Sequence, residues 1–364
     1  MTFVPNLLSP NVKYDNMLSL MDEARGRLGT LEGVGRIMPN PNLLIRPYIT
    51  KEAVHSSKIE GTMASITDVF RFDLERMPNK YDTYSRVREV HNYSIALQKC
   101  LARIDAGADI TLDMIKSVHH MLLDNATGYD KTPGMIRTQQ NYIANVQLHR
   151  SIRDAVYVPP AEHFLDDLLL NLVEFMLKPP PNMPVLVQCA VAHYQFESIH
   201  PFGDGNGRIG RILVPLILAK RRTLSRPLLF LSSYIAQNKS EYYDLLQDVR
   251  QANRWVEWLE FFLNGVIQCS QDAIDATDRM LNLKSQYEQS LLERRSPKSA
   301  TILVNKLFSS PIVTIPVAAE YLKMTYAATK NAMMHLVDVG ILERLDTKKR
   351  DKLYVARDIL DVFS

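Results

Sequence analysis

The sequence predicts a mainly α-helical fold, and three observations support that class. Glycine is scarce, with 14 residues in 364, and helix-forming residues dominate the composition. Apolar residues recur at helical spacing through most of the chain. Only two stretches, within 132–160 and 341–355, have the short apolar runs around polar turns that indicate β-ribbons. The sequence contains no internal repeat and no low-complexity tract.

The overall composition excludes several classes of protein. Hydrophobic residues make up 46% and charged residues 23%, with a formal net charge of +3, so the charge balance requires neither nucleic acid nor a membrane. Cys100, Cys189 and Cys269 are far apart, which favours buried free thiols over disulfides. The N-terminus lacks the pattern of a signal peptide, and no apolar run is long enough to span a membrane. We therefore expect a soluble, cytoplasmic protein.

The first part of the chain is expected to be helical after a short extended arm. The arm contains Pro5 and Pro10, and an amphipathic helix follows over 17–31. Three prolines are expected to punctuate the next segment: Pro39, Pro41 and Pro47. Two helices are predicted within 66–104, the clearer one over 82–101. Its charged residues are interpreted as solvated: Arg86, Arg88 and Glu89.

The middle of the chain contains a further helix and then a ribbon. Thr111 is positioned to cap a helix over 112–123, and the adjacent His119 and His120 are interpreted as structural. Residues 132–160 change character, because the apolar stretches 141–146 and 155–158 flank a polar, basic middle. That pattern predicts a β-hairpin.

Helices are expected again on both sides of a glycine-rich loop. An apolar helix over 163–177 and a second over 185–198 precede the loop, and an apolar run from Ile212 follows it. Residues 232–246 and the aromatic segment 255–263 are also predicted helices. The segment 265–293, rich in Asp, Gln and Ser, is interpreted as a helical connector.

The C-terminal part has the pattern of a winged helix-turn-helix. Residues 317–322, a turn at 323–324 and a helix capped by Thr325 are followed by a ribbon whose basic tip contains Lys348, Lys349 and Arg350. The second helix has Lys330 and His335 as its basic residues, and Asp338 opposes them. That balance favours a protein-interaction or homodimerising module over DNA binding.

The glycine-rich loop carries most of the chemistry. The run His200-Pro201-Phe202-Gly203-Asp204-Gly205-Asn206-Gly207-Arg208-Ile209-Gly210-Arg211 joins two apolar helices. Free amides at a helix N-terminus bind anions, and glycines let the backbone approach them. His200 can take a proton, Asp204 is a hard ligand suited to Mg²⁺, and Arg208 and Arg211 share a helix face from which they can bind phosphate oxygens. The set predicts a polyphosphate site with a base beside it.

This run resembles the signature of the Fic (Fic/Doc) family at each of its fixed positions. The resemblance implies transfer of AMP from ATP to a Tyr, Thr or Ser hydroxyl of a target protein, with His200 as the catalytic base and Mg²⁺ on Asp204. It also implies an ATP-binding set: Glu60, His200, Gly205, Asn206, Gly207, Arg208, Ile209, Gly210 and Arg211. Arg208 would serve the β-phosphate and Arg211 the γ-phosphate.

A second resemblance lies in the N-terminal region, at Ser56-Ser57-Lys58-Ile59-Glu60-Gly61. Ser56 and Glu60 share a helix face, and Gly61 is positioned to end that helix. The segment is similar to the inhibitory motif of Fic proteins that restrain themselves, with Ser56, Glu60 and Gly61 at its fixed positions. The resemblance implies a Glu60–Arg211 ion pair that denies the γ-phosphate its partner.

The resemblance also implies an organisation of the chain and a target site. We expect a helical region with the inhibitory helix over 1–105, a Fic catalytic domain over 106–265, and a connector helix with a winged helix over 266–364. The hairpin would be the family's flap, within 139–157, which holds the target by strand addition. Two alternatives stay open: removal of AMP from a modified protein, and a DNA-binding regulator with a vestigial Fic domain.

Overall fold

The computed structural model describes residues 2–8, 17–37, 42–75, 82–124, 132–144, 155–345 and 352–363. Several predicted features lie outside these residues, namely the middle of the flap with His149, Arg150 and Arg153, the basic tip of the C-terminal ribbon, and Pro10, Pro39 and Pro41. Within them the fold is mainly α-helical, as the sequence predicts, and no helix there is long and apolar enough to cross a membrane.

The N-terminal half is built from helices that the sequence mostly predicts. They are α1 (Leu18–Ile37), α2 (Asn42–Ile59), α3 (Ile66–Glu75), α4 (Asp82–Asp105), α5 (Leu112–Leu123), the 3₁₀ helix η3 (Glu162–Phe164) and α6 (Leu165–Leu177). The Thr111 cap is confirmed, because its hydroxyl accepts the amide of Met114 at 3.2 Å. The interpretation of Pro47 is wrong, since α2 continues through this residue.

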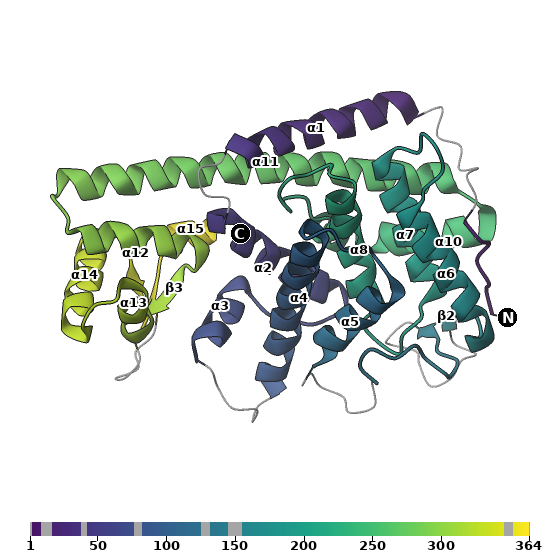
Figure 1. The fold of residues 1–364 in the computed structure, drawn as a ribbon, viewed down its shortest axis with the longest axis horizontal. Helices are drawn as coiled ribbons and strands as arrows, with labels where there is room; N and C mark the ends of the chain where they lie inside the picture. Colours follow the sequence, from purple (N-terminus) through teal and green to yellow (C-terminus); the bar gives the residue numbers. More distant parts are fainter. Residues whose placement is uncertain are drawn as a thin grey trace.

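The helices that carry the motif are the most buried of the fold. They are α7 (Val185–Ile199) and α8 (Asn206–Lys220), and they pack against each other on either side of the loop. α9 (Ser232–Gln237) and α10 (Lys239–Ala252) follow. The predicted aromatic helix and connector form one helix, α11 (Trp255–Glu293), which runs along the molecule beside α1 (Figure 1). Gly265, where the aromatic segment meets the connector, does not interrupt this helix. It lies inside α11, and its lack of a side chain makes room for the ring of Tyr234.

Two small sheets complete the fold. β1 (Ile143–Ala144) and β2 (Ala155–Tyr157) are antiparallel, at the place of the predicted hairpin. The C-terminal unit contains α12 (Lys298–Ser309), β3 (Ile312–Thr314), α13 (Ile315–Leu322), α14 (Tyr326–Asp338), β4 (Glu343–Arg344), β5 (Leu353–Val355) and α15 (Arg357–Asp361). Its sheet has the order β3-β5-β4. The helix-turn-helix and the ribbon are therefore present where the sequence predicts them, and Thr325 caps α14.

The C-terminal unit packs against the helix that carries Glu60. α12 contacts α2, and Tyr48 of α2 packs edge-on against Phe363 with ring centroids 5.2 Å apart. The Tyr48 hydroxyl also donates to the carbonyl of Ala273 in α11 at 3.0 Å. Figure 1 shows this unit at one end of α11 and the motif helices toward the other. α2 is therefore supported by parts of the chain on both sides of it.

A core tryptophan gives a test of this packing. Trp258 of α11 is 1% exposed, and its indole N–H donates to the carbonyl of Ala190 in α7 at 3.1 Å. Trp258→Ala should lower the free energy of unfolding by about 3–5 kcal/mol, because it removes a large buried ring. Leu292→Ala is the matched control on the same helix, where the side chain is 79% exposed, and it should change stability by less than about 0.5 kcal/mol. Urea unfolding of both variants would contradict this packing if the two shifts were equal.

Candidate active site

His200 lies at the junction of α7 and the loop. It is the C-cap of α7 and has a left-handed backbone with φ of 48°. Few residues other than glycine adopt this conformation, and functional residues often do. Its Nδ1 is buried and has no hydrogen-bond partner in the described part of the chain. Burial lowers the pKa of His200 to about 4, so the ring is neutral and able to accept a proton at neutral pH.

The loop after His200 is held through its carbonyl groups. Arg137 donates from Nε to the carbonyl of His200 (3.0 Å) and from its backbone amide to that of Pro201 (2.9 Å). The amide of Asn141 donates to the carbonyl of Phe202 at 3.0 Å. His119 lies within 3.2 Å of the carbonyl of Asp204 through Nε2. The carbonyls of residues 200, 201, 202 and 204 are thus engaged by side chains and backbone from neighbouring elements.

His119 also supports the loop through its ring. Its ring stacks on Phe202 with centroids 4.0 Å apart, and its Nδ1 accepts the backbone amide of Gly134 at 2.8 Å. Since Nδ1 accepts, the proton is on Nε2, which then donates to the carbonyl of Asp204. The interpretation of His119 as a structural residue therefore holds, and its side chain packs directly against the motif loop.

The N-terminus of α8 is open to an anion. The first recorded helical bond runs from the amide of Ile209 to the carbonyl of Gly205 at 3.1 Å. The amides before it, at 206–208, have no intrahelical acceptor, so the positive end of the helix dipole faces the loop. Gly205 begins the helix with φ of 75°, which a residue with a side chain would adopt only under strain. This part of the site can bind phosphate oxygens.

The side chain of Asn206 does not take part in that surface. Its Oδ1 accepts the amide of Phe202 at 2.9 Å, and its Nδ2 donates to the carbonyl of the same residue at 2.8 Å. Asn206 is 2% exposed. The resemblance places Asn206 in the ATP-binding set, but both ends of its side-chain amide bond to Phe202, so the part of Asn206 left for an anion is its backbone amide.

Arg211 forms an ion pair with Glu60, which follows the end of α2 and lies 151 residues earlier in the sequence. Its Nη2 lies 2.7 Å from Glu60 Oε1, and its Nε donates to Ser56 Oγ at 2.8 Å. The ion pair that the resemblance implies is therefore present. Although burial raises the pKa of Glu60, Arg211 outweighs it, and the net pKa of that carboxyl is below its ordinary value.

Two glycines make this contact possible. Gly61, two residues after the last residue of α2, has φ of 89°. The amide of Thr62 bonds back to the carbonyl of Ser57, which is the geometry of a Schellman end. A Cβ at Gly207 would lie 2.2 Å from Glu60 Oε1, so any side chain there would displace the carboxylate. Gly61 therefore ends the helix as predicted, whereas Gly207 is required for close approach rather than for the turn.

Arg208 has a partner that the sequence interpretation missed. Its Nη1 lies 3.2 Å from Glu89 Oε2, and its Nη2 lies 3.5 Å from Asp204 Oδ1. Glu89 is 8% exposed, so its interpretation as a solvated residue is wrong. Nothing local in the sequence marks this residue, because its role comes from the packing of α4 against α8. Ile209 is fully buried on the core side of α8.

Glu52 is a second carboxylate of α2 that sequence reasoning missed. It is 3% exposed and accepts hydrogen bonds from the Tyr93 hydroxyl at 2.9 Å and the Ser232 amide at 3.2 Å. Burial raises the pKa of this carboxyl. Glu52 precedes Ser56 by one helical turn, and it fastens α2 to α4 and α9 next to the Arg211 contact.

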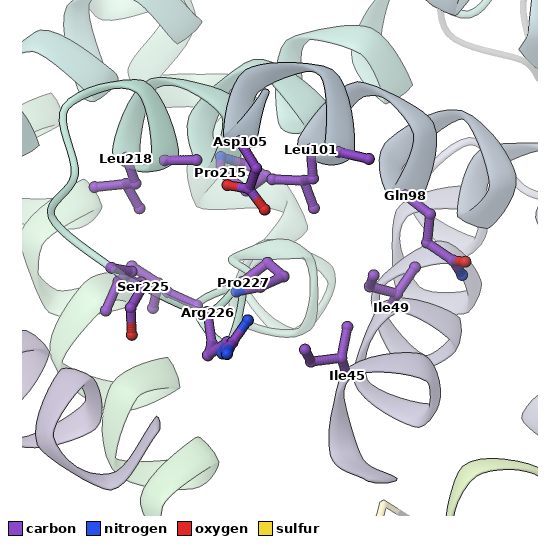
Figure 2. A pocket seen from close by; sticks show the side chains of 14 residues that line it. Ile45, Ile49, Gln98, Leu101, Asp105, Pro215, Leu218, Ser225, Arg226 and Pro227 are labelled. Atoms are coloured by element: carbon purple, nitrogen blue, oxygen red, sulfur yellow. The ribbon is translucent and has the colours of Figure 1, made fainter. Parts of the chain in front are cut away.

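A separate cavity of about 190 Å³ lies at the opposite end of α8. Figure 2 shows it between Ile45 and Ile49 of α2, Leu101 of α4, and Pro215 and Leu218 of α8, with Asp105 and Arg226 at its edge. No residue of the loop or of its two arginines lines it. This cavity is therefore distinct from the candidate active site.

The chain is similar to known proteins over both regions that form the site. A family model described as "Fic/DOC family N-terminal" matches residues 18–102, and one described as "Fic/DOC family" matches residues 109–218. Together the two models cover more than half of the chain.

Curated relatives carry an activity in their names. A protein adenylyltransferase Fic of Nematostella vectensis is 26% identical over 277 residues, which are 73% of this chain and 57% of that protein. A protein adenylyltransferase fic-1 of Caenorhabditis briggsae is 28% identical over 176 residues, or 46% of this chain and 31% of that protein. The chain thus spans 57% and 31% of the lengths of these two relatives.

Solved structures share the fold. A Fic family protein from Desulfovibrio desulfuricans G20 has a TM-score of 0.60 at 17% identity, and the match covers 96% of this chain and 98% of that one. Fic-1 from C. elegans has a TM-score of 0.55 at 20% identity, covering 72% and 74%. The first match extends through the C-terminal unit.

The ion pair of Glu60 predicts a dependence of stability on pH. A carboxyl whose pKa is lowered on folding stabilises above its ordinary value, here 4.5, and loses that contribution as the pH falls through its folded value. Wild type should exceed Glu60→Gln in stability at pH 6–7 by about 1 kcal/mol, because about a third of the Glu60 side chain is exposed. Thermal melts from pH 7 to pH 3 should show the difference shrinking below pH 4.5. A constant difference would mean that Glu60 is not ionised in this contact.

Proposed function

The chain belongs to the Fic/DOC family, and from that premise we propose that it transfers AMP from ATP to a Tyr, Thr or Ser hydroxyl of a target protein. The observation that carries the proposal is the motif loop. One loop and the helix that follows it carry a neutral histidine, an open amide end and two buried arginines. The names of the curated relatives support the same activity.

In the proposed reaction the target hydroxyl attacks the α-phosphorus in line. A bond forms between that oxygen and phosphorus, the bond from phosphorus to the leaving pyrophosphate breaks, and His200 accepts the hydroxyl proton. A base must be unprotonated before it acts, and the low pKa of His200 meets that requirement at neutral pH. The amides at 206–208 stabilise negative charge as it develops on the phosphate.

The remaining motif residues are assigned to the phosphates. Arg208 serves the β-phosphate and Arg211 the γ-phosphate, each after leaving its carboxylate partner. The Asp204 carboxylate fits a single Mg²⁺, because it is a hard oxygen ligand with a 35% exposed side chain at the loop, and Mg²⁺ in such sites takes its other ligands from phosphates and water. When bound, Mg²⁺ would neutralise charge on the α- and β-phosphates.

The same geometry supports self-restraint. Glu60 takes the Arg211 guanidinium that the γ-phosphate needs, and its own charge repels that phosphate. Lys239 of α10 donates to the carbonyl of Ile59, which helps to hold the end of α2 in place. ATP that enters the site must therefore either displace Glu60 or bind with its α-phosphate out of line.

The flap is the proposed docking place for the target. The flap lies beside the loop. Arg137, just before the flap, donates to the carbonyl of His200, and Tyr157 of β2 donates to the carbonyl of Ser198 at the end of α7. Tyr142 and Val156 are 40% and 59% exposed, so apolar surface is available for an added strand.

We assign the C-terminal unit to protein interaction or homodimerisation rather than to DNA. Tyr321, Met324 and Tyr326 expose apolar surface at the corner of the helix-turn-helix. Lys330 and Asp338 are both exposed on α14, so its solvent face is not uniformly basic.

Labelled ATP tests the reaction directly. With purified Glu60→Gly protein, Mg²⁺ and candidate targets, label from the α-phosphate should appear on protein, whereas label from the γ-phosphate should not. His200→Ala in the same background should lower the rate by about 10²–10⁴, as expected for loss of a general base. Label from γ alone would indicate kinase-like chemistry and would overturn the proposal. No label from either would direct attention to removal of AMP from modified proteins.

Glu60→Gly tests the restraint separately. Removing the carboxylate frees Arg211 and removes a charge that repels phosphate, so transfer should rise by ~tenfold or more relative to wild type. The matched control is Glu257→Gly, which removes a half-exposed carboxylate of α11 outside the site. Equal rates in wild type and Glu60→Gly would remove the inhibitory role from Glu60.

A further inference from the structure

Glu197 is a buried carboxyl that the proposed reaction does not use. It lies on α7, three residues before His200, and is 6% exposed. Its Oε1 is buried and has no hydrogen-bond partner in the described part of the chain. A buried carboxyl oxygen without a hydrogen-bond partner costs free energy, and such groups often serve a functional site.

The carboxyl of Glu197 packs on α8 at the residue before Arg211. A Cβ at Gly210 would lie 2.4 Å from Glu197 Oε1 and 3.3 Å from His193 Nδ1. Any residue other than glycine at 210 would therefore displace the carboxyl. This close approach gives Gly210 a role that differs from the nucleotide contact that the resemblance implies.

Charged and titratable groups from four helices surround this position. They are His193 of α7 and His200 at its end, Arg211 of α8, Arg250, Tyr242 and Tyr243 of α10, and Glu60 after the end of α2, together with Tyr157 of β2. Arg250 already stacks on the ring of Tyr157 at 3.7 Å and bonds to Gln247. His193 contacts the Tyr242 hydroxyl at 2.9 Å through Nε2. A Cβ at Gly207, one turn before Gly210 on the same face of α8, would lie 2.2 Å from Glu60 Oε1 and 2.9 Å from Arg211 Nη1. Both carboxylates therefore lie along the face of α8 that carries the Arg211 guanidinium, and they compete for its charge.

We propose that Glu197 is a positioning residue for Arg211: it is the second carboxylate, which balances the guanidinium charge whenever Glu60 leaves it. The inference rests on the proposed function, because it concerns the arginine assigned to the γ-phosphate. Glu60 holds Arg211 in the restrained state, and Glu197 holds it in the released state until ATP arrives.

Movement of Arg211 from Glu60 to Glu197 should release a proton. Burial raises the pKa of Glu197 to about 7; Arg211 lowers it and Glu60 raises it. With Glu60 in place, Glu197 therefore keeps its proton up to about neutral pH. When Glu60 leaves, its negative charge no longer raises the pKa of Glu197, and Arg211 has no other carboxylate partner. The pKa of Glu197 therefore falls, and its proton passes to solvent. Release of Glu60 is thus favoured as the pH rises.

A kinetic test uses Glu197→Gln in two backgrounds, because a structural defect would lower activity in both. With Glu60 present, Arg211 loses its alternative partner, so Glu60 should hold it more tightly and basal transfer should fall severalfold. In the Glu60→Gly background, Arg211 loses its competitor for phosphate. There the KM for ATP at pH 8 should fall by about tenfold, with kcat unchanged.

The pH profile and a control complete that test. In Glu60→Gly the KM for ATP should rise from pH 5 to pH 7 as Glu197 ionises, and adding Glu197→Gln should remove most of that rise. Glu174→Gln, an exposed glutamate of α6, should change neither profile. Equal losses of activity in both backgrounds would overturn the positioning role.

A second measurement does not depend on activity. The carboxyl of Glu197 can be followed by ¹³C NMR in protein without nucleotide, and assigned by its loss in Glu197→Gln. It should titrate near pH 7 in wild type and about one pH unit lower in Glu60→Gly. The same midpoint in both would overturn the inference. A lowered midpoint in Glu60→Gly without any AMP transfer would contradict the proposed function but would still support the coupling between the two carboxylates.

Discussion

The ion pair between Arg211 and Glu60 is the interaction on which the rest of the site depends. It joins two helices that are distant in the sequence, and the guanidinium is buried, with a side-chain exposure of 3%. A buried guanidinium needs a counter-ion, so the position of α2 and the state of α8 are linked. Ser56 and Glu52 strengthen that link, the first by contacting Arg211 and the second by fastening α2 to α4 and α9.

Around this pair, the loop is rigid for reasons that come from other elements. Its carbonyls are held by Arg137, Asn141 and His119, which belong to the start of the flap and to α5. Donors that are already oriented need no reorganisation when charge develops, which is the condition for electrostatic stabilisation of a transition state. The left-handed backbone of His200 is maintained by the same contacts. His200, the start of α8 and the first part of the flap therefore form one connected unit.

Sequence reasoning predicts those parts of the site that depend on local order. The spacing from His200 to Arg211 predicts helix, loop and helix, and the spacing of Ser56, Glu60 and Gly61 predicts the end of α2. It misses parts that depend on packing between helices. Glu89 resembles any solvated glutamate until α4 places it against Arg208, and Asn206 resembles a donor until its amide closes on Phe202. Pro47 is accommodated because the first part of α2 is supported by α11 and by the C-terminal unit.

The contact between Tyr48 and Phe363 has a consequence for the order of events during synthesis. A ribosome makes α2 and the motif helices well before it makes α12 and Phe363. Packing around the helix that carries Glu60 is therefore completed only after the residues of the candidate site have been made. The nascent chain therefore passes through a stage in which the residues of the candidate site have been made but α2 lacks part of its support.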